Sequence, residues 1–185
     1  MKGTVLTTPE TFKEDDVYLE FILRLPHPNR NKNDVHILLR QDYEYIPSKG
    51  DTVEIFGNPI SYDLGKDIGI RLYLTTVVIY PAEGVVSPEE NVISVRGTLK
   101  KAAEVYEKNS HKVIARFAIL PDSNNRTRIP VYCFLEGDSA HDIEKYNIGT
   151  VLTLKGRLIS RNFDYKGTRR STTELLVLNY AKASS

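Results

Sequence analysis

Hydrophobic and polar residues alternate along much of this chain. Between residues 150 and 159 the leucines occupy every second or fourth position and polar or charged residues fill the intervening ones. A period of two with one apolar side is the pattern of a half-buried β-strand. Residues 112–120 and 129–135 show the same alternation, and β-branched residues are frequent throughout. In the C-terminal half the pattern predicts strands at residues 92–100, 112–120, 128–135, 150–161 and 172–180.

One short helix is expected between the third and fourth of these strands. Residues 139–146 lack the strand alternation, and Ser139 is placed to cap a helix there. The N-terminal half has only residues 41–49 in the corresponding place, so we expect its helix to be shortened or absent. Five strands with a helix between the third and fourth is the order of a Greek-key OB barrel, an all-β fold.

The chain contains this unit twice. Blocks of similar sequence recur in the same order at a nearly constant offset: residues 3–5 as 97–99, 20–26 as 116–121, 50–57 as 149–156, and 74–80 as 175–180. A stretch punctuated by Pro and Gly, residues 81–88, separates the copies. We therefore predict two tandem five-stranded OB domains, residues 1–84 and 91–185, joined by a linker at residues 85–90.

Composition narrows the class of protein. The chain is 41% hydrophobic and 26% charged, the balance of a globular protein with a core. It has no apolar run of the ~20 residues that a membrane helix needs, and its first residues lack the apolar segment of a secretory signal. The single cysteine, Cys133, excludes an internal disulfide. We expect a cytoplasmic protein without membrane association.

Charge is divided unevenly between the halves. Residues 1–86 carry 9 Lys and Arg against 13 Asp and Glu, a net charge of −4. The remaining residues carry 16 and 11, a net charge of +5. Repulsion from phosphate should weaken nucleic-acid binding by the first unit, so we expect the second unit to bind and the first to serve mainly another role.

Strand parity places cations and aromatic rings together on the outward face of the second unit. Ile129, Val131, Cys133 and Leu135 are expected to point inward. Single-stranded nucleic acid is bound by such a face, because cations follow the phosphates and each ring stacks on a base for ~1–3 kcal/mol. The outward residues are Lys112, Arg116, Arg128, Tyr132, Phe134, Lys155, Arg157, Arg161 and Phe163. Most have unlike counterparts in the first unit: Asp16 for Lys112, Glu20 for Arg116, His36 for Tyr132, Leu38 for Phe134, Phe56 for Lys155 and Asn58 for Arg157.

The densest basic and aromatic cluster is a predicted hairpin at residues 161–170. It carries Arg161, Phe163, Tyr165, Lys166, Arg169 and Arg170. Arg126 and Arg128, in the loop after the second strand, are expected to form the opposite wall of a binding channel. The competing interpretation is a solvated edge, because charged side chains also protect exposed strands from aggregation.

Several of these segments resemble a known family. Residues 91–99 resemble the opening strand of bacterial single-stranded DNA-binding proteins, and residues 149–167 with Thr173 and Glu174 resemble their fourth strand, long hairpin and fifth strand. The resemblance covers most of residues 91–180 and implies binding of single strands across the sheet and along its loops. Unlike the family, the chain has no Trp, and Phe163 stands where the hairpin Trp is common. It also ends without the acidic tip, itself ending in Phe, that the family carries. Small primosomal OB proteins lack this tip as well.

Signals for chemistry are weak. His27, His36, His111 and His141 are too scattered for a metal-ligand spacing, and Cys133 is expected to be a buried apolar residue. We find neither a phosphate-binding Gly-Lys-Ser/Thr loop nor a nucleophile elbow. We therefore expect no enzymatic activity, no metal and no cofactor.

Two functions remain open at this stage. The first is sequence-tolerant binding of single-stranded DNA in replication, repair or recombination, by base stacking and phosphate neutralisation. The second is an OB-fold interaction module that docks a replication protein and does not itself bind nucleic acid. The tandem chain could also self-associate into a four-barrel assembly, as the family often does, but no residue in the sequence fixes the number of copies. The sequence does not discriminate DNA from RNA, because recognition of the 2′-hydroxyl depends on a few placed hydrogen bonds.

Overall fold

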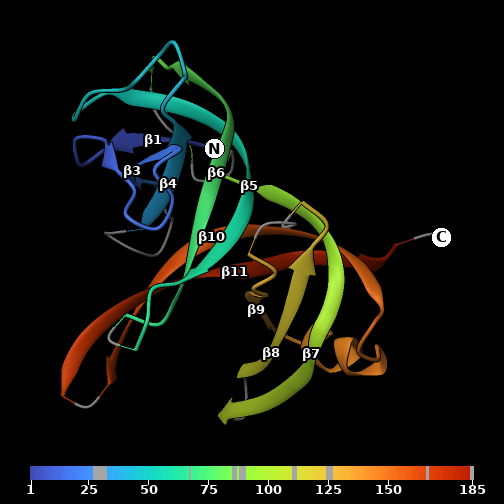
Figure 1. Cartoon of the computed structure of the whole chain (residues 1–185). Helices are drawn as coiled ribbons and strands as arrows, with labels where there is room; N and C mark the ends of the chain where they lie inside the picture. Colours follow the sequence, from blue (N-terminus) through green and yellow to red (C-terminus); the bar gives the residue numbers. More distant parts are fainter. Residues whose placement is uncertain are drawn as a thin grey trace.

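The computed structural model describes residues 1–26, 33–66, 68–84, 87, 91–109, 112–123, 127–165 and 167–183. Within these ranges the side chains of residues 108, 109, 112, 162–165 and 168–171 are not described. The described part of the chain forms two β-barrels that lie side by side (Figure 1).

The first barrel is built from the N-terminal strands. These are β1 (Lys2–Val5), β2 (Glu10–Thr11), β3 (Tyr18–Arg24), β4 (Asp34–Arg40), β5 (Thr52–Asp63) and β6 (Ile70–Pro81). They hydrogen-bond in the order β1-β5-β6-β4-β3-β2, and a pairing of β1 with β3 closes the barrel. The short β2 lies outside this closed ring, against β3.

The second barrel repeats the same arrangement. It consists of β7 (Ile93–Asn109), β8 (Lys112–Pro121), β9 (Val131–Glu136), β10 (Val151–Tyr165) and β11 (Thr168–Lys182), closed in the order β10-β11-β9-β8-β7. The prediction of two tandem OB folds is confirmed among the described residues. The domain boundaries stay a prediction, because most of the expected linker lies outside the described residues.

Strand register supports the internal alignment of the two units. Each barrel contains one parallel pairing, β4 with β6 and β9 with β11. Ile37 lies opposite Leu74 in the first, and Cys133 lies opposite Leu175 in the second. Glu20 likewise lies opposite Leu38, as Arg116 lies opposite Phe134. The sequence repeat is therefore also a repeat of sheet positions.

A glycine marks the same irregularity in both barrels. The register shifts between Phe56 and Gly57, and again between Lys155 and Gly156. A Cβ atom on Gly57 would lie 2.2 Å from the carbonyl oxygen of Thr75, and one on Gly156 would lie 2.4 Å from that of Leu176. No side chain fits at that distance, so glycine is required where each long strand bends to close its barrel.

The expected helix is present in the second barrel, as a single α-helical turn, α1 (Ser139–Asp142), followed by a 3-10 turn, η2 (Ile143–Lys145). The expectation that Ser139 caps it is wrong. Asp138 occupies the N-cap position and makes no side-chain capping bond. Gly137, at φ +92°, precedes it, and its carbonyl accepts the N–H of Ala140. Residues 41–50 are all described and form no helix.

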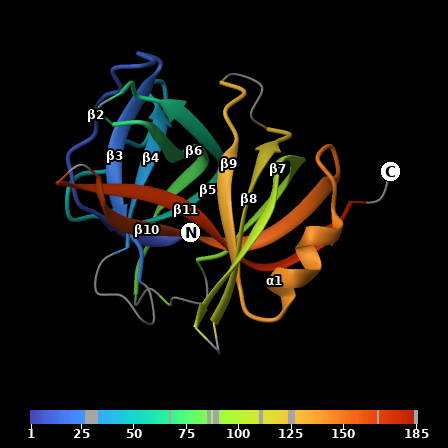
Figure 2. The ribbon, with the colours of Figure 1, turned by 90° about the horizontal axis from the view of Figure 1, so that it is seen from below.

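The core lies inside the barrels. The expected inward residues Val131, Cys133 and Leu135 are buried, and Ala140 with Ile143 of the short helical segment joins the same cluster. Figure 2 shows α1 on the side of the second barrel that faces away from the first. The face toward the first barrel is left for contacts between the barrels.

The two barrels touch through their long hairpins. Figures 1 and 2 both show the β10–β11 hairpin extending from the second barrel past the first. The Asn33 side-chain amide donates to the carbonyl of Leu158 at 3.0 Å and accepts the N–H of Ser160 at 2.8 Å. A second contact is made by the β5–β6 hairpin of the first barrel, where Ser61 Oγ donates to the Pro130 carbonyl at 3.3 Å. These bonds fix the orientation of one barrel relative to the other.

Candidate nucleic-acid interface

A groove of about 350 Å³ crosses the outer face of the second barrel. We call it the second-barrel groove. Its lining includes Ile70, Lys101, Glu104, Tyr106, Arg116, Tyr132, Arg161, Thr172 and Glu174. These residues come from β7, β8, β9, β10 and β11, and Ile70 comes from β6 of the first barrel.

Strand register explains why these side chains share a face. Ala118 on β8 lies opposite both Tyr132 on β9 and Lys101 on β7. Arg116, two residues earlier on β8, lies opposite Glu104. Directly opposed residues project to the same side of a sheet, and residues two apart on a strand do as well. Tyr132 and Tyr106 are each about half exposed, so both rings are open to a ligand.

The acidic residues of the groove are already engaged. Glu104 accepts a hydrogen bond from the Tyr106 hydroxyl at 2.5 Å and pairs with Lys101 at 3.0 Å, which together hold the pKa of the Glu104 carboxyl below its usual range. Glu174 pairs with Arg161 at 2.8 Å. Arg116 forms no ion pair with any side chain that the structure describes, so its charge is available to a phosphate.

Three of the residues expected from the sequence line this groove, namely Arg116, Tyr132 and Arg161. Phe134 does not behave as expected. Its exposed fraction is 8%, although strand parity predicted an exposed ring. It lies between Arg116 on β8 and Leu176 on β11, because β9 has a neighbouring strand on each side. Parity gives only the side of the sheet to which a residue points, so it does not reveal burial of this kind between neighbouring strands.

Other expected residues are described but do not belong to the lining of the groove. Lys155 is exposed opposite Asn179, six residues before Arg161, a separation of about 20 Å along β10. Arg157 is partly buried opposite Leu176. Arg128 is exposed just before β9 and has an unusual positive φ of 54°. A role of these three in binding stays a prediction.

Apart from Arg161, the expected hairpin cluster is described in its backbone at most. Phe163 lies opposite Arg170, and Asp164 opposite Arg169, in the β10–β11 hairpin. The side chains of Phe163, Tyr165, Arg169 and Arg170, and of Lys112 at the start of β8, are not described. Arg126 and Lys166 lie outside the described residues. Their contribution also stays a prediction.

The sequence interpretation missed the residues that β7 contributes. The strand was expected to end at residue 100 but continues to Asn109. The signal was present, because the partly buried Ala103 and Val105 alternate with the exposed Glu104 and Tyr106. Ile70 was missed for another reason, since only the packing of the two barrels brings it to the groove.

The corresponding face of the first barrel is covered by its own chain. Phe12, next to β2, is 3% exposed and packs against Tyr62 and Tyr73 with ring centroids 5.0 and 5.1 Å away. Leu38, the counterpart of Phe134, belongs to the same small cluster. Burial raises the pKa of Tyr73 to about 12. Phe12 therefore fills a surface that is open in the second barrel.

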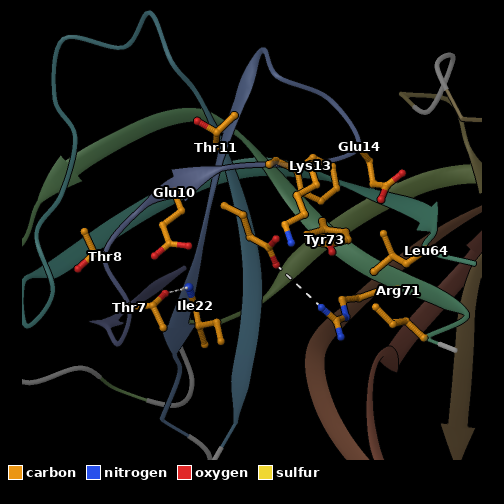
Figure 3. A pocket seen from close by; sticks show the side chains of 13 residues that line it. Thr7, Thr8, Glu10, Thr11, Lys13, Glu14, Ile22, Leu64, Arg71 and Tyr73 are labelled. Atoms are coloured by element: carbon orange, nitrogen blue, oxygen red, sulfur yellow. Dashed lines mark hydrogen bonds and ion pairs between the residues drawn. The ribbon is translucent and has the colours of Figure 1, made fainter.

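A cavity of about 390 Å³ lies beside this cluster (Figure 3). Its charged lining consists of Glu10, Glu14 and Glu20 with Lys13 and Arg71. Glu20 is held by His36 at 2.7 Å and faces Arg71 at 4.0 Å. Because carboxylates outnumber the permanent cations, this cavity is unsuited to phosphate. The first barrel thus differs from the second in charge as well as in coverage.

Neither a candidate metal site nor a membrane-spanning helix is found among the described residues. They contain no cluster of three or more His, Cys, Asp or Glu side chains that could hold a metal ion. Cys133 is buried, and burial raises the pKa of its thiol. No helix in the described ranges is long and apolar enough to span a membrane.

Comparison with known proteins gives one relative in sequence and several in structure. The chain is 33% identical over 94 residues to the single-stranded DNA-binding protein of Staphylococcus epidermidis, an alignment that covers 47% of this chain and 71% of that protein. The wild-type single-stranded DNA binding protein of Thermus aquaticus superposes over 100% of this chain and 91% of its own, with a TM-score of 0.71 and 14% identity. A deletion mutant of that protein superposes with the same TM-score and identity and 92% of its chain covered. No family model matches the chain.

Proposed function

Since this chain belongs to the family of single-stranded DNA-binding proteins, we propose that it binds single-stranded DNA, without regard to base sequence, through the second-barrel groove. Binding proceeds by stacking of bases and neutralisation of phosphates and includes no chemical step. The protein acts in DNA replication, repair or recombination, the processes in which single-stranded DNA is exposed.

One observation carries this proposal. The groove combines two half-exposed tyrosine rings, Tyr106 and Tyr132, with the guanidinium of Arg116, which forms no ion pair with a described side chain. A ring can stack on the face of any base, and a guanidinium binds phosphate oxygens without contacting the base. Together they bind a single strand and ignore its sequence.

The first barrel has a secondary place in this proposal. Its corresponding face is filled by Phe12, and its neighbouring cavity is lined mostly by carboxylates. We infer that the first barrel does not offer an independent site for a strand. Its role is to support the second barrel and to present surface to other partners.

The test is fluorescence anisotropy of a labelled oligo-dT and of a duplex of equal length, at low and moderate salt. We expect binding of the single strand alone, with affinity falling as salt rises. Tyr132→Ala should weaken binding roughly 5- to 150-fold, the range of one lost stacking contact. Tyr80→Ala is the matched control, because Tyr80 is a similarly exposed tyrosine on the first barrel. An equal loss in both variants would contradict the assignment of the site.

A second candidate function is favoured by a different surface. Phe56 and Tyr80 are each about half exposed on the first barrel, and their rings lie 6.4 Å apart. An exposed apolar patch of this kind is typical of a protein-docking surface. If the wild-type protein fails to bind oligo-dT even at low salt, docking of a replication protein becomes the better account.

A further inference from the structure

One wall of the second-barrel groove belongs to the first barrel. Ile70 is the first residue of β6, yet it lines the groove together with Tyr132 and Arg161 of the second barrel. Its exposed fraction is 38%, so part of the side chain faces open space in the groove. An aliphatic side chain at this position is not needed to bury the core of either barrel, since Ile70 belongs to neither core cluster.

The position of Ile70 relative to Tyr132 is fixed by the contacts between the barrels. Ser61, on the preceding strand of the same hairpin, donates to the carbonyl of Pro130, two residues before Tyr132. Ser61 also lies opposite Leu72, two residues after Ile70. One hydrogen bond therefore joins the strand pair that carries Ile70 to the strand that carries Tyr132. The Asn33 bonds to β10 hold the same interface from its other side.

We propose that Ile70 is a DNA-contacting residue, which packs on a nucleobase stacked against the groove tyrosines and so makes the binding site a product of both barrels. The inference rests on the proposed function. A base stacked on one ring leaves its second face exposed to water, and an aliphatic side chain opposite that face removes it from solvent. Because the contact is apolar and is made to a ring face, it accepts every base.

Electrostatics favours this position over the rest of the first barrel. Around the groove the carboxylates Glu104 and Glu174 are paired with Lys101 and Arg161. Arg71, adjacent to Ile70, faces the first-barrel cavity near Glu20. Bound DNA thus contacts the first barrel at an uncharged side chain, and the net negative charge of that barrel does not oppose the contact.

Ile68 supplies a matched control in the same hairpin. It is 50% exposed and lines the first-barrel cavity rather than the groove. Ile70→Asp and Ile68→Asp add the same charge two residues apart, so long-range repulsion of DNA should be nearly equal in the two variants. Only Ile70→Asp also places a carboxylate against the bound base.

The experiment measures oligo-dT affinity by anisotropy for the full chain and both variants at one salt concentration. We expect Ile70→Asp to weaken binding about tenfold more than Ile68→Asp does. Equal affinities of the two variants, with wild-type binding intact, would overturn the role of Ile70 and leave the proposed function standing. Absence of wild-type binding would overturn both.

A second measurement does not depend on loss of affinity. Ile70→Cys and Ile68→Cys are each labelled with an environment-sensitive thiol dye, while the native Cys133 is buried and stays unlabelled. Saturating oligo-dT should shift the emission of the dye at position 70 and leave that at position 68 unchanged. Equal shifts at both positions would contradict the proposal.

Discussion

The side-chain amide of Asn33, in the first barrel, accepts a hydrogen bond of 2.8 Å from the backbone N–H of Ser160, in the second. The same amide donates to the carbonyl of Leu158, so one buried side chain satisfies two backbone groups of β10. The amide thereby donates and accepts hydrogen bonds as the backbone of a neighbouring β-strand would. It couples the two barrels, and because the Asn33 side chain is buried, water cannot easily replace these two hydrogen bonds.

Replacing this amide should uncouple the barrels and destabilise both. Asn33→Ala removes one buried and one partly buried hydrogen bond and leaves backbone groups of β10 without these partners, at an expected cost of about 1–3 kcal/mol. Urea unfolding followed by circular dichroism measures the loss. Asn58→Ala is the control, since Asn58 is exposed and should change stability by less than about 0.5 kcal/mol. Similar effects of both variants would contradict the coupling role of Asn33.

The salt dependence of binding should separate the cation in the groove from one outside it. Arg116→Gln removes a groove guanidinium and should lower the slope of log affinity against log salt by about 0.7, the value for one phosphate contact on a single strand. Lys155→Gln removes a cation outside the groove lining, about 20 Å from Arg161 along β10, and should leave the slope nearly unchanged. Titrations at four salt concentrations measure both slopes. A larger change in slope for Lys155→Gln than for Arg116→Gln would contradict this assignment and place the phosphate contact near Lys155.

Two phenylalanines of the first barrel should differ in their contribution to stability. Phe12→Ala empties a buried position between Tyr62 and Tyr73, with an expected cost of about 3 kcal/mol. Phe56→Ala removes a half-exposed ring and should cost less than about 1 kcal/mol. Urea unfolding compares the two. Affinity for oligo-dT should stay at the wild-type value in Phe12→Ala, because uncovering the face leaves Glu20 in place of a cation.

Alkaline pH should destabilise the first barrel through Tyr73. Burial raises the pKa of Tyr73 to about 12, against about 10 in the unfolded chain, so the fold favours the neutral phenol. This contribution is complete below pH 10 and is lost as the pH rises toward 12, amounting to about 2–3 kcal/mol. Urea unfolding at pH 8 and pH 11.5 should therefore show a smaller loss in Tyr73→Phe than in wild type. Equal losses would contradict the assignment.

Much of the fold follows from the sequence because repetition and strand parity are local properties. The alternation of leucines between residues 150 and 159 correctly gave the buried face, since Leu152, Leu154 and Leu158 are all buried. The alignment of Glu20 with Arg116 also agrees with the strand register. Each inference needed only neighbouring residues or a comparison of two segments.

The site was less accessible from the sequence because it depends on contacts between distant segments. Arg116 and Tyr132 were identified by parity, but the burial of Phe134 depends on its neighbours on two other strands. Ile70 reaches the groove only because the barrels pack together. The coverage of the first barrel by Phe12 likewise required knowing where residues 10–12 turn back on the sheet.

The glycines at the strand bends indicate how a duplicated chain can diverge. Gly57 and Gly156 hold the same place in the two barrels, and each lies too close to a carbonyl to accept any side chain. Outward positions have no such restriction, and there the two copies differ. In the sequence alignment of the two copies, Glu20 corresponds to Arg116 and His36 corresponds to Tyr132. Mutational drift after duplication is thus channelled to the surface. One copy can specialise in a ligand while the other loses that ability, and both keep the bends that close their barrels.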